Sequence, residues 1–301
     1  MQLRQPASIQ KGPIMETAAK LRPGTPDDAE VCGQICFDAF GAIATAHGFP
    51  SDFPTPQIAL GLLSMLLAHP GFYGVVAETG GRVVGSNFLD ERAPILGIGP
   101  ITVAPDAWDR GIGRILMNDV LGRASERSAP GVRLVQTAYH NRSLALYAEL
   151  GFQVRDLLAC VQGPPIGAAV SGYTVRPATI DDVESCDELC RRVHGHHRGG
   201  EVADAIAQGS ALVAEHDGRI TGYSTGVAFF GHSVAESNEG LKALIGATHE
   251  FAGPGILVPT SNGDLLRWCL AHGLRVVELM TLMSIGLFNE PAGAYLPSVL
   301  Y

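Results

Sequence analysis

Two arginines and two glycines stand together where a predicted strand gives way to a predicted helix. The chain runs GPITVAP over residues 99–105 and DRGIGR over residues 109–114, and apolar residues recur at helical spacing from residue 112 onward. The first amides of a helix lack partners inside the helix and carry partial positive charge. Gly111 and Gly113 let the backbone approach an anion, and Arg110 and Arg114 add charge-assisted hydrogen bonds. The stretch therefore predicts a pyrophosphate site.

The spacing of these residues does not fit two common nucleotide-binding motifs. A dinucleotide fingerprint needs a third glycine where this chain has Leu116. A Walker loop needs Gly-Lys followed by Ser or Thr, whereas Gly113 is followed by Arg114. Taken alone, the glycines could also do no more than end a turn, so the surrounding sequence has to decide.

Two longer patterns surround this loop. V-x-P-x-x-x-x-R-G-x-G-x-x-L-M begins at Val103, and N-R-S-L-A-L-Y-x-x-L-G-F begins at Asn141. Together they resemble the two signature motifs of the GNAT superfamily of acyl-CoA-dependent N-acyltransferases, over about residues 19–163. One position departs from the family pattern, because Trp108 stands where a Gln or Arg is usual. Since most of such a cradle is backbone, we expect binding to survive this change.

The resemblance implies a role for each matching residue. Val103 would end the strand that backs the pantetheine arm, and its N–H would stabilise the thioester oxyanion. Tyr147 would protonate the departing thiolate, although its helical spacing also suits a core residue. Asn141 would contact the pantetheine or the acyl end. The expected acetyl-CoA-binding residues are Ile101, Thr102, Val103, Arg110, Gly111, Ile112, Gly113, Arg114, Ile115, Asn141, Ser143 and Tyr147.

No residue stands out as the base that takes the proton of the attacking amine. Asp90 and Glu91 end a predicted strand near the expected entry of the acceptor, and Glu91 is the candidate base. A solvated surface role for these acids and a chain of water molecules remain alternatives. Glu78 is less suitable, because Glu215 repeats it later in the chain and so suggests a role in the fold. Direct attack of the amine needs no nucleophilic cysteine.

The chain contains two copies of one pattern. LRPGTPDDAEVCGQIC (21–36) resembles VRPATIDDVESCDELC (175–190), VVAETGGRVVG (75–85) resembles LVAEHDGRITG (212–222), and YAELGFQV (147–154) resembles CLAHGLRV (269–276). We therefore expect an α/β (α+β) protein with two tandem GNAT-like domains, each a mixed, mostly antiparallel twisted sheet flanked by helices. The expected boundaries are a flexible extension over 1–18, a catalytic domain over 19–163, a linker over 164–172 and a degenerate domain over 173–301.

The second copy keeps the fold pattern but not the residues for chemistry. Residues 228–247 contain no Gly-x-Gly flanked by arginine, and Cys269 stands where the first copy has Tyr147. We expect this copy to pack against the first and to wall the acceptor pocket, together with loops 46–56, 88–97 and 193–210. His194, His196 and His197 are read as an exposed loop, rather than as metal ligands or acceptor contacts.

Composition narrows the classes of function. The 301-residue chain is 46% hydrophobic and carries a net charge of −9, which argues against nucleic-acid binding. It has no apolar run long enough to cross a membrane. Six cysteines without a CxxC pair predict reduced, buried thiols and a cytoplasmic protein.

The sequence thus predicts an N-acetyltransferase that moves an acetyl group from acetyl-CoA to a primary amine of a small molecule or peptide, by direct attack in a ternary complex and without a metal. The expected protein is a monomer or a homodimer, without nucleic-acid or membrane partners. The alternative is a non-catalytic acyl-CoA-binding sensor or scaffold protein. A protein that uses the fold only for interaction is disfavoured by the intact Arg-Gly-Ile-Gly-Arg loop.

Overall fold

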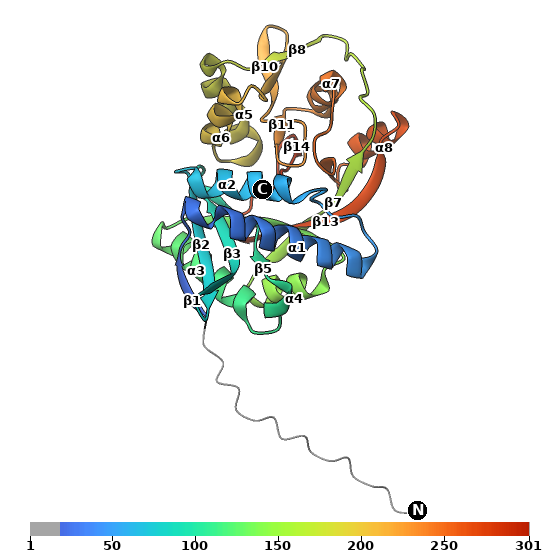
Figure 1. Ribbon diagram of the computed structural model, residues 1–301. Helices are drawn as coiled ribbons and strands as arrows, with labels where there is room; N and C mark the ends of the chain where they lie inside the picture. Colours follow the sequence, from blue (N-terminus) through green and yellow to red (C-terminus); the bar gives the residue numbers. More distant parts are fainter. Residues whose placement is uncertain (1–18, 301) are drawn as a thin grey trace, which may run out of the picture.

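The computed structural model describes residues 19–300, so the predicted extension over 1–18 lies outside the described residues. The helices and strands of the first copy follow the predicted order through residue 162 (Figure 1). The elements are β1 (Lys20–Pro23), α1 (Ala29–His47), α2 (Pro56–Ala68), β2 (Phe72–Thr79), β3 (Arg82–Asp90), β4 (Ile95–Ile98), β5 (Thr102–Val103), α3 (Ile112–Glu126), β6 (Gly131–Thr137), α4 (Asn141–Glu149) and β7 (Gln153–Gln162).

The second copy begins after residues 164–172, which join β7 to the next strand. It follows the strand and helix order of the first copy, except that one strand, β11, precedes α7 where β4 and β5 precede α3, and that a further strand, β14, comes at its end. Its elements are β8 (Tyr173–Pro177), α5 (Val183–His194), α6 (Gly199–Ala207), β9 (Leu212–His216), β10 (Arg219–Ser224), β11 (Ser233–Ala235), α7 (Asn238–Ala247), β12 (Ile256–Pro259), α8 (Gly263–Ala271), β13 (Arg275–Gly286) and β14 (Ala294–Leu296).

The same ion-paired cluster closes the start of both copies. In each, one arginine from the first strand binds an aspartate at the start of the first helix and a glutamate on the neighbouring strand. The clusters are Arg22 with Asp28 (2.7 and 2.8 Å) and Glu78 (2.8 Å), and Arg176 with Asp182 (2.7 and 2.8 Å) and Glu215 (2.9 Å). The predicted internal repeat is thereby confirmed, and Glu78 and Glu215 occupy equivalent positions in the two clusters.

The two copies exchange strands in the larger sheet. Its order is β1-β2-β3-β4-β6-β13-β7-β12, with β5 paired to β3. Strand β13 of the second copy lies between β6 and β7 of the first, and β7 in turn lies between β13 and β12 of the second. Figure 1 shows the long β7 and β13 running together between the two copies. The copies therefore share one continuous sheet, which the sequence analysis did not anticipate.

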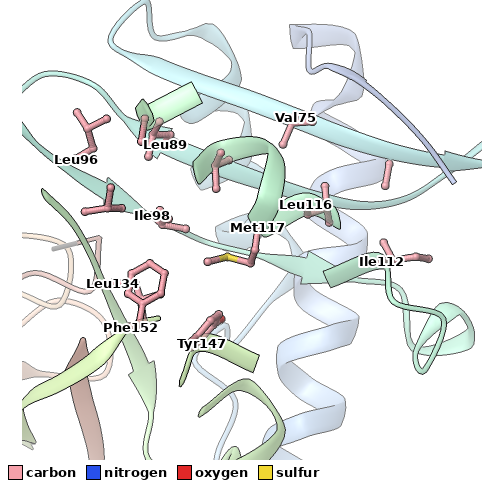
Figure 2. Close-up of a cluster of buried hydrophobic side chains, with 14 of the residues drawn as sticks. Val75, Leu89, Leu96, Ile98, Ile112, Leu116, Met117, Leu134, Tyr147 and Phe152 are labelled. Atoms are coloured by element: carbon pink, nitrogen blue, oxygen red, sulfur yellow. The ribbon is translucent and has the colours of Figure 1, made fainter. Parts of the chain in front are cut away.

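The core of the first copy lies between α3 and the sheet. Ile112, Leu116, Met117 and Val120 recur at helical spacing and are all buried, which explains the apolar face of α3. Figure 2 shows Leu116 and Met117 directed toward the sheet residues of this cluster, with Tyr147 at its lower edge. Residues 112–120 thus fix the start of α3, and with it the glycine loop, against the sheet.

The cysteines match the prediction of buried, reduced thiols. All six are free and buried, and burial raises the pKa of the Cys32 thiol to about 11. Within residues 19–300, no helix has both the length and the apolar character that a membrane span requires.

The strand exchange predicts that the first copy cannot fold alone as a monomer. A chain of residues 1–163 would leave β6 and β7 without β13 between them, so their exposed edges should drive aggregation or dimerisation. Size-exclusion chromatography and circular dichroism would report this, and supplying residues 164–301 in trans should restore a native heterodimer. A stable, folded monomer of residues 1–163 would contradict the prediction.

Candidate functional site

The functional cavity begins where two neighbouring strands part. Strands β4 and β6 pair in parallel only from Ile95 with Gly131 to Gly97 with Arg133. Beyond that point the chain turns at Gly99, and β5 pairs with β3 instead, Ser86 facing Thr102. Strand β6 continues on the other side, paired with β13. The facing edges of β5 and of the end of β6 therefore leave an opening in the sheet.

The backbone of Val103 points into this opening. The Ala104 N–H donates to the Val84 carbonyl on the β3 side, at 2.9 Å. Because backbone groups alternate in direction along an antiparallel strand, the N–H and C=O of Val103 face away from β3. The Trp108 indole N–H donates to the Val103 carbonyl at 2.7 Å. Trp108, which departs from the family pattern, therefore anchors the end of β5.

A cavity of about 370 Å³ runs through the opening. Its walls come from the start of α3, the ends of β5 and β6, α4, the loop after α1 and a part of the second copy. The residues from the first copy that matter below are Asp52, Ile101, Thr102, Val103, Trp108, Gly111, Ile112, Gly113, Arg114, Gln136, Tyr139, His140, Arg142, Ser143 and Tyr147. The structure thus brings together most of the residues that the motifs predicted.

One end of the cavity is built to receive an anion. Gly111 caps α3 with a φ of 75°, a left-handed conformation that favours glycine. The first helical hydrogen bond runs from the Ile115 N–H to the Gly111 carbonyl at 3.2 Å, so the amides of residues 112–114 have no helical acceptor. Arg114 lines the cavity and forms an ion pair with Glu149. This end therefore combines free amides with positive charge.

The basic residues at this end differ in part from those predicted. Arg110 is exposed, donates to the Asp106 carbonyl at 3.1 Å and does not line the cavity. Arg142 lines it instead, 2.8 Å from Asp109. The sequence analysis passed over Arg142, although it stands inside the second motif. Ile115 and Asn141 also lie outside the lining.

Tyr147 lines the cavity from α4 with only 5% of its surface exposed. Burial raises the pKa of Tyr147 to about 12, so the phenol keeps its proton at neutral pH. Ser143 acts on Tyr147 in the opposite sense and lowers its pKa, and the Ser143 hydroxyl lies 2.7 Å from Nδ1 of His140. Ser143 therefore interacts with both Tyr147 and His140, a residue that the motif analysis did not include.

The two acids at the end of β3 form ion pairs with arginines. Glu91 accepts from Arg123 Nε at 2.8 Å and lies 3.3 Å from Arg127. Asp90 is paired with Arg92 in the same way. Neither acid lines the cavity, so the structure gives Glu91 no position from which to act as a base. Two acids do line it. Asp109 is paired with Arg142, and Asp52 lies within the loop 46–56 that was expected to shape the acceptor pocket.

The second copy has the same opening, and its own chain fills it. Glu236 N–H donates to the Thr221 carbonyl at 2.9 Å, as Ala104 does to Val84 in the first copy. The backbone of Ala235 then faces the position that corresponds to the opening, where it pairs with Ala294 of β14. Strand β14 therefore lies where an extended ligand would lie in the first copy.

The histidines of the second copy are placed differently from the expectation. His194 and His196 are 2% and 7% exposed, so the prediction of an exposed loop is wrong for both. The ring of His194 packs edge-on to Tyr295 at 5.2 Å, which explains its burial. Neither lines the cavity. Over residues 19–300, no group of three or more His, Cys, Asp or Glu side chains is arranged to hold a metal ion.

Comparison with known proteins agrees with this architecture. The acetyltransferase (GNAT) family model matches residues 40–152, and no curated protein matches the sequence. A presumed acetyltransferase from Pyrococcus horikoshii is 18% identical with a TM-score of 0.70, covering 96% of this chain and 97% of its own. A GCN5-related N-acetyltransferase from Sphaerobacter thermophilus is 16% identical with a TM-score of 0.58, covering 90% and 96%.

A third solved structure is a tandem GNAT protein from the clavulanic acid biosynthesis pathway. It is 18% identical with a TM-score of 0.52, covering 89% of this chain and 98% of its own. At these identities the solved structures establish the fold alone, which is that of two tandem GNAT-like copies. The match to the acetyltransferase (GNAT) family model covers residues 40–152, within the first copy.

Proposed function

We propose that this protein is an N-acetyltransferase that acts on a primary amine, with a single acetyl-CoA site in the first copy. The observation that carries the proposal is the shared cavity, which joins the free amides of residues 112–114, the Val103 backbone and the Tyr147 phenol. The second copy supports one site per chain, because β14 fills the equivalent opening.

Different residues of the cavity would have different roles in the reaction. Acetyl-CoA would supply the activated acetyl thioester. Residues 111–114 with Arg142 would hold its pyrophosphate, and Val103 would bind the pantetheine arm as a neighbouring strand does. The Val103 N–H would stabilise the negative charge that develops on the acetyl oxygen. Tyr147 would give its proton to the sulfur and regain one through Ser143 and His140.

A non-catalytic sensor that binds acyl-CoA would use the same loop and the same strand edge. It would not need the buried phenol of Tyr147 at the thioester end of the cavity. The phenol of Tyr147 is buried and keeps its proton at neutral pH, which favours the enzyme, since acyl-CoA binding alone requires no proton donor.

Gly113→Glu should abolish acetyl-CoA binding. A Cβ at Gly113 would meet only Leu146 Cδ2 at 3.6 Å, so the variant should fold while its carboxylate repels the pyrophosphate. Calorimetric titration should show about one site per wild-type chain and none in the variant. Gly122→Glu is the matched control, because Gly122 is exposed on the same helix and a Cβ there meets nothing within 4 Å. Retained binding in Gly113→Glu would overturn the assigned site.

Tyr147→Phe should separate catalysis from binding. We expect kcat to fall by about 100-fold, which is typical of a lost general acid, while the acetyl-CoA Kd changes by less than about twofold. Release of free CoA with an amine acceptor measures the first quantity, and calorimetry measures the second. Unchanged turnover in Tyr147→Phe would remove the assigned acid, and a wild type that binds acetyl-CoA without turning over any amine would favour the sensor.

A further inference from the structure

One part of the cavity wall, its apolar end, is built by both copies. The first copy contributes side chains from α1, from the loop after it and from α2, and the second contributes its chain end and the segment after β10. The apolar residues at this end include Phe40, Ile43, Phe53, Phe229, Phe230 and Leu300. An acceptor that reaches this end exchanges water for apolar surface, which favours an acceptor with an apolar body.

Within this apolar end, Gln136 presents an oxygen without a partner. Gln136 is 7% exposed, and its Nε2 donates to the Thr281 hydroxyl at 2.8 Å. Among residues 19–300, nothing donates to its Oε1. A buried acceptor of this kind is destabilising unless a ligand supplies the donor.

Asp52 is a half-buried carboxylate that lines the same cavity. Two ring contacts hold its loop, with Phe49 stacked on Tyr139 at 4.2 Å and Phe53 edge-on to Phe40 at 5.4 Å. Burial is what raises the pKa of Asp52, and no neighbouring cation acts against it. The loop therefore places a carboxylate beside apolar side chains, where its charge is disfavoured unless a cation joins it.

The groups that face Asp52 provide no positive charge. They are Glu278 on β13, Tyr139 after β6, Cys36 on α1 and Cys160 on β7, while His47 and His140 lie beyond Tyr139. Burial raises the pKa of Asp52 to about 6, and burial with the Asp52 charge raises the pKa of Glu278 to about 8. At neutral pH, Asp52 is therefore ionised and Glu278 keeps its proton.

We propose that the acceptor is a primary amine on an apolar body, and that Asp52 binds its ammonium group and acts as the base, with Gln136 accepting a second hydrogen bond. This inference rests on the proposed function. It names an acceptor class and assigns a catalytic role to a residue outside both motifs. A polyamine or an amino acid would have to bury additional charge among the phenylalanines, so both should be poor acceptors.

The protons balance in this arrangement. The bound ammonium gives one proton to Asp52, which releases it to solvent, and the neutral nitrogen then attacks the acetyl carbon. As the N–C bond forms and the C–S bond breaks, the sulfur gains a proton from Tyr147. The nitrogen loses a second proton to solvent, and Tyr147 regains one from solvent, so these two transfers cancel. The products are the N-acetyl amine, free CoA and one released proton.

The acceptor class is tested with wild-type protein and five amines. The probes are 2-phenylethylamine and hexylamine as apolar amines, and spermidine, L-lysine and a basic hexapeptide as charged ones. We expect kcat/KM for the apolar amines to exceed that for the charged ones by about tenfold or more. A preference for any charged amine, or acetyl-CoA binding without acetylation of either apolar amine, would overturn the proposal.

The role of Asp52 is tested with Asp52→Asn, which keeps the shape and removes the charge. We expect kcat/KM for 2-phenylethylamine to fall by about 100-fold or more, with acetyl-CoA affinity unchanged. Since the carboxylate must be ionised, wild-type kcat/KM should fall as the pH drops through about 6, and this limb should vanish in Asp52→Asn. Asp38→Asn is the matched control, because Asp38 is exposed on α1 and outside the cavity lining.

The Glu278→Gln variant tests which of the two carboxylates, Asp52 or Glu278, is the base. Because Glu278 is already protonated near pH 6, this variant should keep the limb, and loss of the limb here instead would assign the base to Glu278. Normal acceptor kinetics in Asp52→Asn would also overturn the inference while leaving the proposed function standing. If wild-type protein failed to bind acetyl-CoA by calorimetry, the proposed function itself would fail.

Discussion

The exchange of β7 and β13 is the constraint on which the rest of the structure depends. Each copy supplies the strand that the other copy's sheet lacks, so neither can complete its hydrogen bonding alone. The exchange also builds the cavity, because Thr281 of β13 holds the Gln136 side chain of β6. The second copy is therefore a part of the site's framework, whatever chemistry it has lost.

The two copies share one strand geometry, but it has a different result in each. In both, the residue just before one that hydrogen-bonds to the preceding strand turns its own N–H and C=O toward an opening in the sheet. In the first copy no described strand pairs with Val103 on this side, and its carbonyl accepts from Trp108, whereas in the second Ala235 pairs with Ala294. The tail then continues past β14 to Leu300, which lines the cavity of the first copy. One short segment thus closes the second opening and walls the first.

The sequence predicted those features whose residues are neighbours along the chain. The glycine loop, Tyr147 and the internal repeat belong to contiguous patterns, and the structure places them as expected. Features that depend on distant partners escaped prediction. The sequence suggested that Glu91 is available as a base, but Arg123 of α3 binds it. It also suggested that His194 is exposed, but the ring of Tyr295 packs against it. The sequence also does not reveal the strand exchange, because the apolar pattern of β7 and β13 is the same whichever copy they pair with.

The groups that line the cavity differ in charge, and this difference would give the proposed reaction its direction. Free amides with Arg114 and Arg142 would hold the anion of the donor, while Asp52 would hold the cation of the acceptor. Burial shifts the pKa of Asp52 to about 6 and that of Tyr147 to about 12. Both shifts go upward, yet the two values lie on opposite sides of neutral pH. The carboxylate is therefore ready to accept a proton at the amine end, and the phenol is ready to donate one at the sulfur end, so that proton transfer follows the same axis as the acetyl group.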